Sequence, residues 1–250
     1  MEKPTQNNTF EYEKSDVKTS SQFNNYSQFS RDQEIGSITK EIEELHHLDK
    51  SSWTIRKQDN VRGAPHCIAS YNEERKMLKV CIDIEAPLNK VLTYIMAPPF
   101  GLRNTIIKES PCNPEILEKL GKGAVIGYNQ MPKINCCVFH ISSRDCVTMQ
   151  AMKLLSSNTA LYGVKSVEHK SRPPVDDVYR IDYPLMGSYL HAEGNVVHVE
   201  SYFAEVDLGG KIGKMGACMI MHNWVKETIK LANEIPSMLD VTSPPYEQFL

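Results

Sequence analysis

The chain has 250 residues, with 28 lysines and arginines against 31 aspartates and glutamates, so its formal net charge is −3. This charge gives no support for a nucleic-acid partner, because such proteins gather positive charge to neutralise phosphates. The composition, 41% hydrophobic and 24% charged, is ordinary for a globular protein. The length predicts one domain of about 200 residues with a tail, which is large enough to enclose an internal pocket.

The sequence also bears on the cellular compartment. No apolar segment typical of a secretory signal follows Met1, and the apolar run at 91–100 is too short to span a membrane. The seven cysteines are odd in number, and several lie in apolar runs, which favours free thiols over a disulfide framework. We therefore expect a cytoplasmic protein in a reducing compartment.

Three segments differ in composition. Residues 1–33 are rich in Asn, Gln, Ser and Thr, and this composition predicts a disordered polar tail. The folded domain is expected over 34–240, followed by a short C-terminal tail at 241–250. At the start of the domain, apolar residues recur every three or four positions and predict a helix, namely Ile35, Ile38, Ile42, Leu45 and Leu48.

The middle of the domain alternates between short apolar runs and turn residues, which is typical of antiparallel strands. Ala86-Pro87 begins a predicted helix that ends before Pro98-Pro99. Gly194-Asn195 predicts a hairpin turn. Strands are predicted at 54–61, 67–71, 78–84, 104–108, 123–130, 136–141, 146–155, 159–168, 178–182, 188–192 and 196–206.

The last predicted element is an amphipathic helix over 214–235. One side carries Ala217, Ile220, Trp224, Val225 and Leu231, and the other side is polar. An apolar side this broad has to cover a sheet, a lipid or a membrane surface. A bent antiparallel sheet wrapped around one C-terminal helix can enclose a cavity, so the order of elements predicts an α+β protein with an internal pocket.

Several segments together resemble the StAR-related lipid-transfer (START) domain family. They are Ser143-Arg144-Asp145, Ser166-Val167-Glu168-His169 with Pro173-Pro174, Gly187 with its flanking strands, and Val206-Asp207-Leu208-Gly209-Gly210 before the last helix. The resemblance covers about residues 34–235 and implies a helix-grip fold whose tunnel holds one lipid. It departs from the family at Arg103-Asn104, where a Trp-Asp pair is usual, so a choline preference is not carried over.

The resemblance directs attention to polar and aromatic residues that could line the tunnel. Arg144 is the first candidate for a ligand contact or a buried ion pair, and the alternative is an Arg144–Asp145 pair at the surface or in a turn. Arg180 and Asp182 form a second candidate pair, expected at the surface. The remaining candidates for the ligand-binding wall are Tyr128, Tyr162, Tyr202, Phe203, Met219 and Trp224.

A gate and a membrane contact are expected at the loop after residue 168 and at the hinge before the last helix. Basic residues near an anionic leaflet favour binding to it. The predicted gate and membrane-contact residues are Lys170, Arg172, Pro173, Pro174, Lys211, Ile212, Lys214 and Met215.

Other chemistries have weaker patterns. Cys136-Cys137 with His140, and His46-His47, lack the spacing of a metal site. The run 209–215 fails the phosphate-loop pattern at both ends, and no nucleophile elbow is present. His198 and Glu200, two apart on one strand, could form an acid–base pair in an enzyme.

We expect a non-enzymatic protein that carries one lipid between membranes, with a weak preference for phospholipid and with no cofactor or metal. Its partners would be the lipid cargo and, transiently, a membrane surface. Two alternatives remain: a helix-grip enzyme acting on a hydrophobic small molecule, and a lipid sensor that does not transfer its ligand.

Overall fold

The computed structural model describes residues 28–59, 67–96, 114–121, 123–131, 133–136, 139–206, 213–240 and 246–247. Within these ranges, side chains are described except at 28–31, 57–59, 134–136, 139–141 and 213–223. The predicted disordered tail and the predicted strand at 104–108 therefore lie, wholly or largely, outside the described residues.

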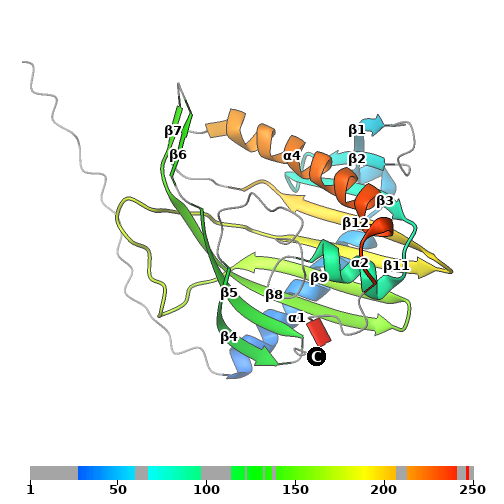
Figure 1. The fold of residues 1–250 in the computed structure, drawn as a ribbon, viewed down its shortest axis with the longest axis horizontal. Helices are drawn as coiled ribbons and strands as arrows, with labels where there is room; N and C mark the ends of the chain where they lie inside the picture. The colour runs from blue at the N-terminus through cyan, green and yellow to red at the C-terminus, as the bar shows by residue number, and fades with distance from the viewer. Residues whose placement is uncertain are drawn as a thin grey trace, which may run out of the picture.

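One large sheet forms the body of the molecule (Figure 1). Its strands run in the order β1-β2-β3-β12-β11-β9-β8-β5-β4, all neighbours pair antiparallel, and β10 pairs with the start of β8 in parallel. The bounds are β1 Thr54–Asp59, β2 Cys67–Asn72, β3 Met77–Ile84, β4 Glu115–Gly121, β5 Ala124–Met131, β8 Arg144–Ser156, β9 Thr159–Ser166, β10 Tyr179–Arg180, β11 Met186–Glu193 and β12 Val196–Ala204.

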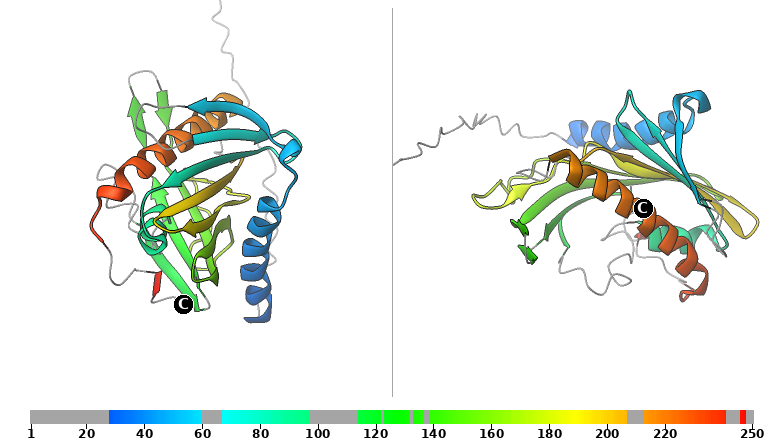
Figure 2. Two further views of the ribbon diagram at one scale, coloured as in Figure 1. Left: turned by 90° about the vertical axis from the view of Figure 1, so that its right-hand side faces the viewer. Right: turned by 90° about the horizontal axis from the view of Figure 1, so that it is seen from above.

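Helices cover both faces of this sheet (Figure 2). Helix α1 (Gln28–His46) packs on β8, β9 and β11 from one side, which we call the outer face. On the opposite, inner face lie α2 (Leu88–Ile95) and the long α4 (Gly213–Glu234). Two short 3-10 helices, η1 (Lys50–Ser52) and η3 (Ile235–Ser237), complete the helical elements described.

Strand alternation divides the buried residues into two clusters. On β12, Val197, Val199 and Phe203 belong to the inner cluster with α2 and α4. Tyr202 belongs to the outer cluster with Ile38 and other residues of α1. Because successive side chains point to opposite faces, a single strand contributes to two separate cores.

Two glycines allow α1 to lie close against the sheet. Gly163 on β9 and Gly187 on β11 are directly opposite each other. A Cβ added at Gly163 would lie 2.4 Å from Ile38 Cγ2, and one added at Gly187 would lie 2.3 Å from the Tyr162 carbonyl oxygen. The side chains of α1 thus occupy the space that these two residues leave free.

The C-terminal end of α4 is attached to α2. The ammonium of Lys90, only 8% exposed, donates to the Pro236 carbonyl oxygen at 3.1 Å and to the Asp240 carboxylate at 3.0 Å. The Tyr94 hydroxyl donates to the Leu239 carbonyl oxygen. Tyr246 is buried in the inner cluster, so part of the segment expected as a C-terminal tail packs against the core.

Most predicted elements are confirmed, with two departures. The single strand predicted at 136–141 is wrong: β6 (Ile134–Cys136) and β7 (Phe139–Ile141) form a separate antiparallel hairpin. The edge strand β4 was not predicted, because its charged residues obscure the alternation expected of a strand. Among the described helices, none is long and apolar enough to cross a membrane.

Candidate functional site

A cavity of about 220 Å³ lies between the inner face of the sheet and the helices α2 and α4. The sheet supplies most of its wall, and Ile95 of α2 and Thr228 and Leu231 of α4 contribute the rest of the described lining. Apolar groups on the strands include Val164, Met186 and Phe203. The sequence produces this wall by alternation, since every second residue of β5, β8, β9, β11 and β12 faces inward.

Neutral polar groups interrupt this apolar wall and pair with one another. The Tyr162 hydroxyl donates to Gln150 Oε1 at 3.1 Å, and the hydroxyls of Ser188 and Ser201 lie 2.9 Å apart. All four residues are at most 5% exposed. Buried polar groups are costly unless they are hydrogen-bonded, and these pairs satisfy that requirement within the protein.

Charge is scarce around the cavity. Among the described lining residues the only side chain with a formal charge is Glu115, at the start of β4. Its carboxylate is bonded to the guanidinium of Arg172. The wall described thus suits an apolar molecule with an uncharged polar end.

Two of the predicted ligand-binding residues border the cavity with their side chains on the inner face. Tyr162 lies in the wall, and Phe203 stacks on Trp224 of α4 with ring centroids 4.9 Å apart. Tyr128 also borders the cavity, but its ring packs with the outer cluster and lies 4.8 Å from the Arg172 guanidinium. Burial is the main cause that raises the pKa of Tyr128.

Other predicted residues lie elsewhere. Tyr202 is fully buried in the outer cluster, where its hydroxyl donates to Glu200 Oε2 at 2.5 Å. Arg144, 6% exposed, is not among the described lining residues; its Nη1 donates to the Ser142 carbonyl oxygen and its guanidinium lies 5.6 Å from the Tyr179 ring centroid. The side chain of Met219 is outside the described residues. Ligand contact by these residues stays a prediction.

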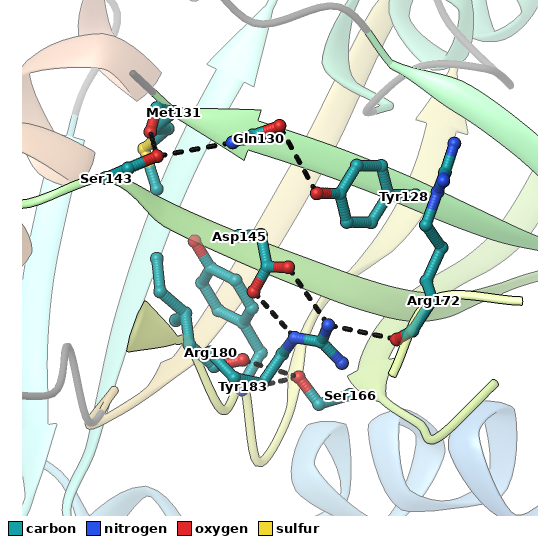
Figure 3. Close-up of polar contacts among 10 residues, drawn as sticks. Tyr128, Gln130, Met131, Ser143, Asp145, Ser166, Arg172, Arg180 and Tyr183 are labelled. Atoms are coloured by element: carbon teal, nitrogen blue, oxygen red, sulfur yellow. Dashed lines mark hydrogen bonds and ion pairs between the residues drawn. The ribbon is translucent and has the colours of Figure 1, made fainter. Parts of the chain in front are cut away.

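The surface pair expected between Arg180 and Asp182 is not the pair observed, because Arg180 bonds instead to the buried Asp145 on the neighbouring strand β8 (Figure 3). Arg180 Nε and Nη2 donate to Asp145 Oδ1 and Oδ2 at 2.7 and 3.0 Å, and Nη2 also donates to the Arg172 carbonyl oxygen at 3.0 Å. Asp145 is 2% exposed. The sequence could not identify this partner, because β10 reaches β8 only through a loop of irregular structure.

The loop at 167–178, which carries part of the predicted gate, is fastened to strand β4. Arg172 pairs with Glu115, and His169 Nε2 lies 3.4 Å from Glu118 Oε2. Pro173 and Pro174 are exposed at its tip, and Lys170 is exposed beside them. Of the other predicted gate residues, Lys211 and Ile212 are outside the described residues, and Lys214 and Met215 lie in the first turn of α4.

The acid–base pair of the enzyme alternative does not form. His198 Nδ1 lies 2.6 Å from Asp83 Oδ1, whereas Glu200 bonds to His46 and Tyr202. Both His198 and Glu200 alternate with inward-facing neighbours and so lie on the outer face, away from the cavity. Within the described residues no group of three or more His, Cys, Asp or Glu could hold a metal ion.

Comparison with solved structures identifies the architecture. Human StAR-related lipid transfer protein 5 superposes with a TM-score of 0.66 over 84% of this chain and 97% of its own, at 16% identity. Human STARD10 superposes with a TM-score of 0.59 over 82% of this chain and 78% of its own, at 17% sequence identity. The chain has the START fold. The helix-grip architecture implied by the sequence resemblance is thereby confirmed, although no protein-family model and no curated protein matches the sequence.

Several cavity residues of this START-type domain escaped the sequence analysis. They are the small polar residues of the wall, namely Asn129, Thr148, Gln150, Ser188 and Ser201. A signal was available on β8, where Cys146, Thr148 and Gln150 alternate with Val147, Met149 and Ala151. Reading the more polar face as the cavity side would have identified two of the five.

Proposed function

We propose that this protein binds one lipid in the cavity under α4 and carries it through the cytosol between membranes. The observation that carries the proposal is the cavity itself, with a mostly apolar wall and a few neutral polar groups. The neighbour whose name includes lipid transfer supports the same role. No turnover is part of the proposal, since the acid–base pair considered for an enzyme faces away from the cavity.

The free energy of lipid transfer constrains how such a carrier would work. Exposing the roughly 30 methylenes of a two-chain lipid to water would cost about 24 kcal/mol, at about 0.8 kcal/mol each. Release into water is therefore excluded on any useful timescale. The cargo has to pass directly between bilayer and cavity while the protein is docked on a membrane.

We propose that opening involves the N-terminal part of α4 and the loop at 167–178. The C-terminal end of α4 is attached to α2 through Lys90, which favours movement at the other end. Opening the loop would break the Arg172–Glu115 pair, and Lys170 beside the exposed Pro173-Pro174 would then face an anionic leaflet. Lys211, Ile212, Lys214 and Met215 keep their proposed role as membrane contacts at the start of α4.

The weak preference for phospholipid finds no support among the described lining residues. A phosphate taken out of water needs a cationic or multiply hydrogen-bonding partner. The described wall offers neither lysine nor arginine. The proposed function therefore names a lipid without assigning it to the phospholipids.

Incubation of the purified full chain with mixed-lipid vesicles, followed by separation and mass spectrometry of the protein fraction, tests the proposal. One lipid class at near-stoichiometric occupancy is expected. Folded protein that emerges empty from vesicles of several compositions would overturn the carrier role. Transfer between donor and acceptor vesicles then separates a carrier from a sensor that holds its ligand.

A further inference from the structure

The polar groups of the cavity wall fall into two sets. Tyr162 with Gln150, and Ser188 with Ser201, bond to each other. Asn129 on β5 and Thr148 on β8 form the second set, whose side-chain oxygens are not paired in this way. Asn129 Oδ1 is buried and accepts no hydrogen bond from any described residue, and the Thr148 hydroxyl likewise has no hydrogen-bond partner within the part of the chain described.

Asn129 and Thr148 are neighbours on the inner face. In the β5–β8 ladder Asn129 is opposite Cys146, and Thr148 is opposite Gly127, so the two residues are diagonal neighbours. Such residues lie about 7–8 Å apart across an antiparallel pair. Gly127 has no side chain to cover the Thr148 hydroxyl, and one ligand oxygen between the two side chains could reach both.

Their chemistry is complementary to a hydroxyl group. Asn129 Oδ1 accepts a hydrogen bond, and Thr148 both donates and accepts. An unpartnered buried acceptor is costly, on the order of 1–3 kcal/mol, so an occupant that donates to it is favoured over one that cannot. A ligand hydroxyl would donate to Asn129 and accept from Thr148.

The charge of the described lining residues and the volume of the cavity limit which lipids could bind there. The one formal charge among the described lining residues, Glu115, is negative and already paired with Arg172. An anionic or zwitterionic head group would find no cation among the described lining residues. The cavity, about 220 Å³, is also smaller than the ~300–1,000 Å³ of sites for drug-sized ligands. It favours a compact molecule over a lipid with two long chains and a large head group.

We infer that the cargo is an uncharged lipid with a hydroxyl at its polar end, and that Thr148 and Asn129 bind this hydroxyl. The inference rests on the proposed lipid-binding function and assigns specificity within it. The pairs Tyr162–Gln150 and Ser188–Ser201 then line the path of the apolar body, with their polarity already satisfied inside the protein.

The first test offers the full chain vesicles of phosphatidylcholine and phosphatidylserine that also contain a sterol, a monoacylglycerol and a long-chain alcohol. Extraction of one of the three uncharged hydroxyl lipids is expected. Extraction of a phospholipid would overturn this inference while leaving the lipid-carrier proposal intact. An empty, folded protein would overturn both.

The second test assigns the two residues. Thr148→Val and Asn129→Leu keep side-chain size and remove the hydrogen-bonding groups, so each should weaken binding of the extracted lipid about 3- to 10-fold. Thr39→Val is the matched control, because Thr39 is a buried threonine of α1 whose hydroxyl bonds within its helix. Thermal melting of each variant reports whether the fold is retained.

A methyl ether of the extracted lipid sharpens the assignment, since it accepts a hydrogen bond and cannot donate one. The unmodified chain should prefer the alcohol to the ether, and Asn129→Leu should abolish that preference. Equal binding of alcohol and ether by the unmodified chain, or a preference that survives in Asn129→Leu, would contradict the role given to Asn129.

Discussion

At the scale of single residues, the ion pair between Asp145 and Arg180 joins β8 to the short strand β10 and fixes the loop before it. The pair is bidentate, and Asp145 is 2% exposed. A buried pair is weak evidence of net stability, because both charges lose their hydration. Removal of one partner is a different case, since it leaves the other charge buried alone.

We therefore expect Arg180→Met to lower the free energy of unfolding by about 3–5 kcal/mol. Urea denaturation followed by circular dichroism measures the change. The double variant Asp145→Leu with Arg180→Met should recover much of the loss, because no unpaired charge remains. Additive losses in the double variant would show that the pair stabilises the fold in its own right.

His198 gives a pH-dependent prediction. Its hydrogen bond with Asp83, and then the charges of Asp83 and Glu193, raise the pKa of His198 above 6.5. A raised folded-state pKa stabilises the fold below the unfolded value of about 6.5, and this stabilisation is lost as pH rises through the folded value. The side chain is 44% exposed, which limits the effect through solvent screening.

His198→Gln should accordingly lower the stability by about 0.2–0.5 kcal/mol near pH 5.5 and leave it unchanged near pH 9. Thermal melting at several pH values compares the variant with the unmodified chain. A loss that is the same at both pH values would mean that packing, rather than charge, accounts for the contribution of His198.

At the scale of elements, the contact between α1 and the sheet depends on the absence of two side chains. A methyl group at Gly187 would meet the Tyr162 carbonyl oxygen, which belongs to the backbone and has little freedom to move. We expect Gly187→Ala to lower the free energy of unfolding by about 1–3 kcal/mol, as overpacking does.

Gly36→Ala is the matched control for Gly187→Ala. Gly36 is an exposed residue of α1 with no atom within 4 Å of an added Cβ, so alanine should raise stability by about 0.5–1 kcal/mol. Urea denaturation should show a lower free energy of unfolding for Gly187→Ala and a higher one for Gly36→Ala, if the lack of space at Gly187 is the cause. Equal changes in the free energy of unfolding for the two variants would contradict this explanation.

The attachment of the C-terminal end of α4 also rests on one buried side chain. Lys90→Met removes the ammonium that donates to both Pro236 and Asp240. We expect it to lower the free energy of unfolding by about 1.5–3 kcal/mol, as the loss of hydrogen bonds to a charged group does. Amide hydrogen exchange over residues 231–238 should then become about 10- to 100-fold faster. Lys40→Met, at an exposed pair on α1, should leave this exchange unchanged.

The order of elements could be predicted because local patterns determine it. The stripe on α1, the Pro87 start of α2 and the Gly194 turn, where φ is +62°, are each specified within a few residues. The contacts that shape the site were harder to predict. Asp145 and Arg180 are 35 residues apart, and Lys90 and Asp240 are 150 apart, so no local pattern connects them.

The same reasoning explains why the predicted ligand-wall residues lie on different faces of the sheet. The side chains of Tyr202 and Tyr128 pack with the outer cluster, and the face that a strand residue occupies depends on the pairing register, which residue type does not reveal. Tyr162 and Phe203 border the cavity because their strands place them on the inner face. Residue type alone could not distinguish the aromatic residues of the inner face from those of the outer face.

At the scale of the whole molecule, the exposed loop tip and the start of α4 form the proposed membrane contact. Lys170 is exposed there, whereas the charge of Arg172 is engaged by Glu115. We expect Lys170→Glu to weaken binding to anionic vesicles by up to about tenfold, since each basic residue contributes about 1 kcal/mol. Vesicle sedimentation measures the change.

Lys40→Glu is the control for docking orientation. Lys40 lies on α1, on the outer face, and the substitution makes the same change in net charge. It should leave vesicle binding close to that of the unmodified chain. An equal loss in both variants would indicate attraction by overall charge, with no defined docking surface.

The sheet divides the buried residues into an outer cluster against α1 and an inner cluster that contains the cavity. The two clusters use the same strands but have no described residue in common, so the inner cluster could loosen while the outer cluster holds the register of β8, β9 and β11. Such a protein would have two levels of stability within one domain. It could admit and release a bulky guest repeatedly, and each cycle would begin from a framework that never had to refold.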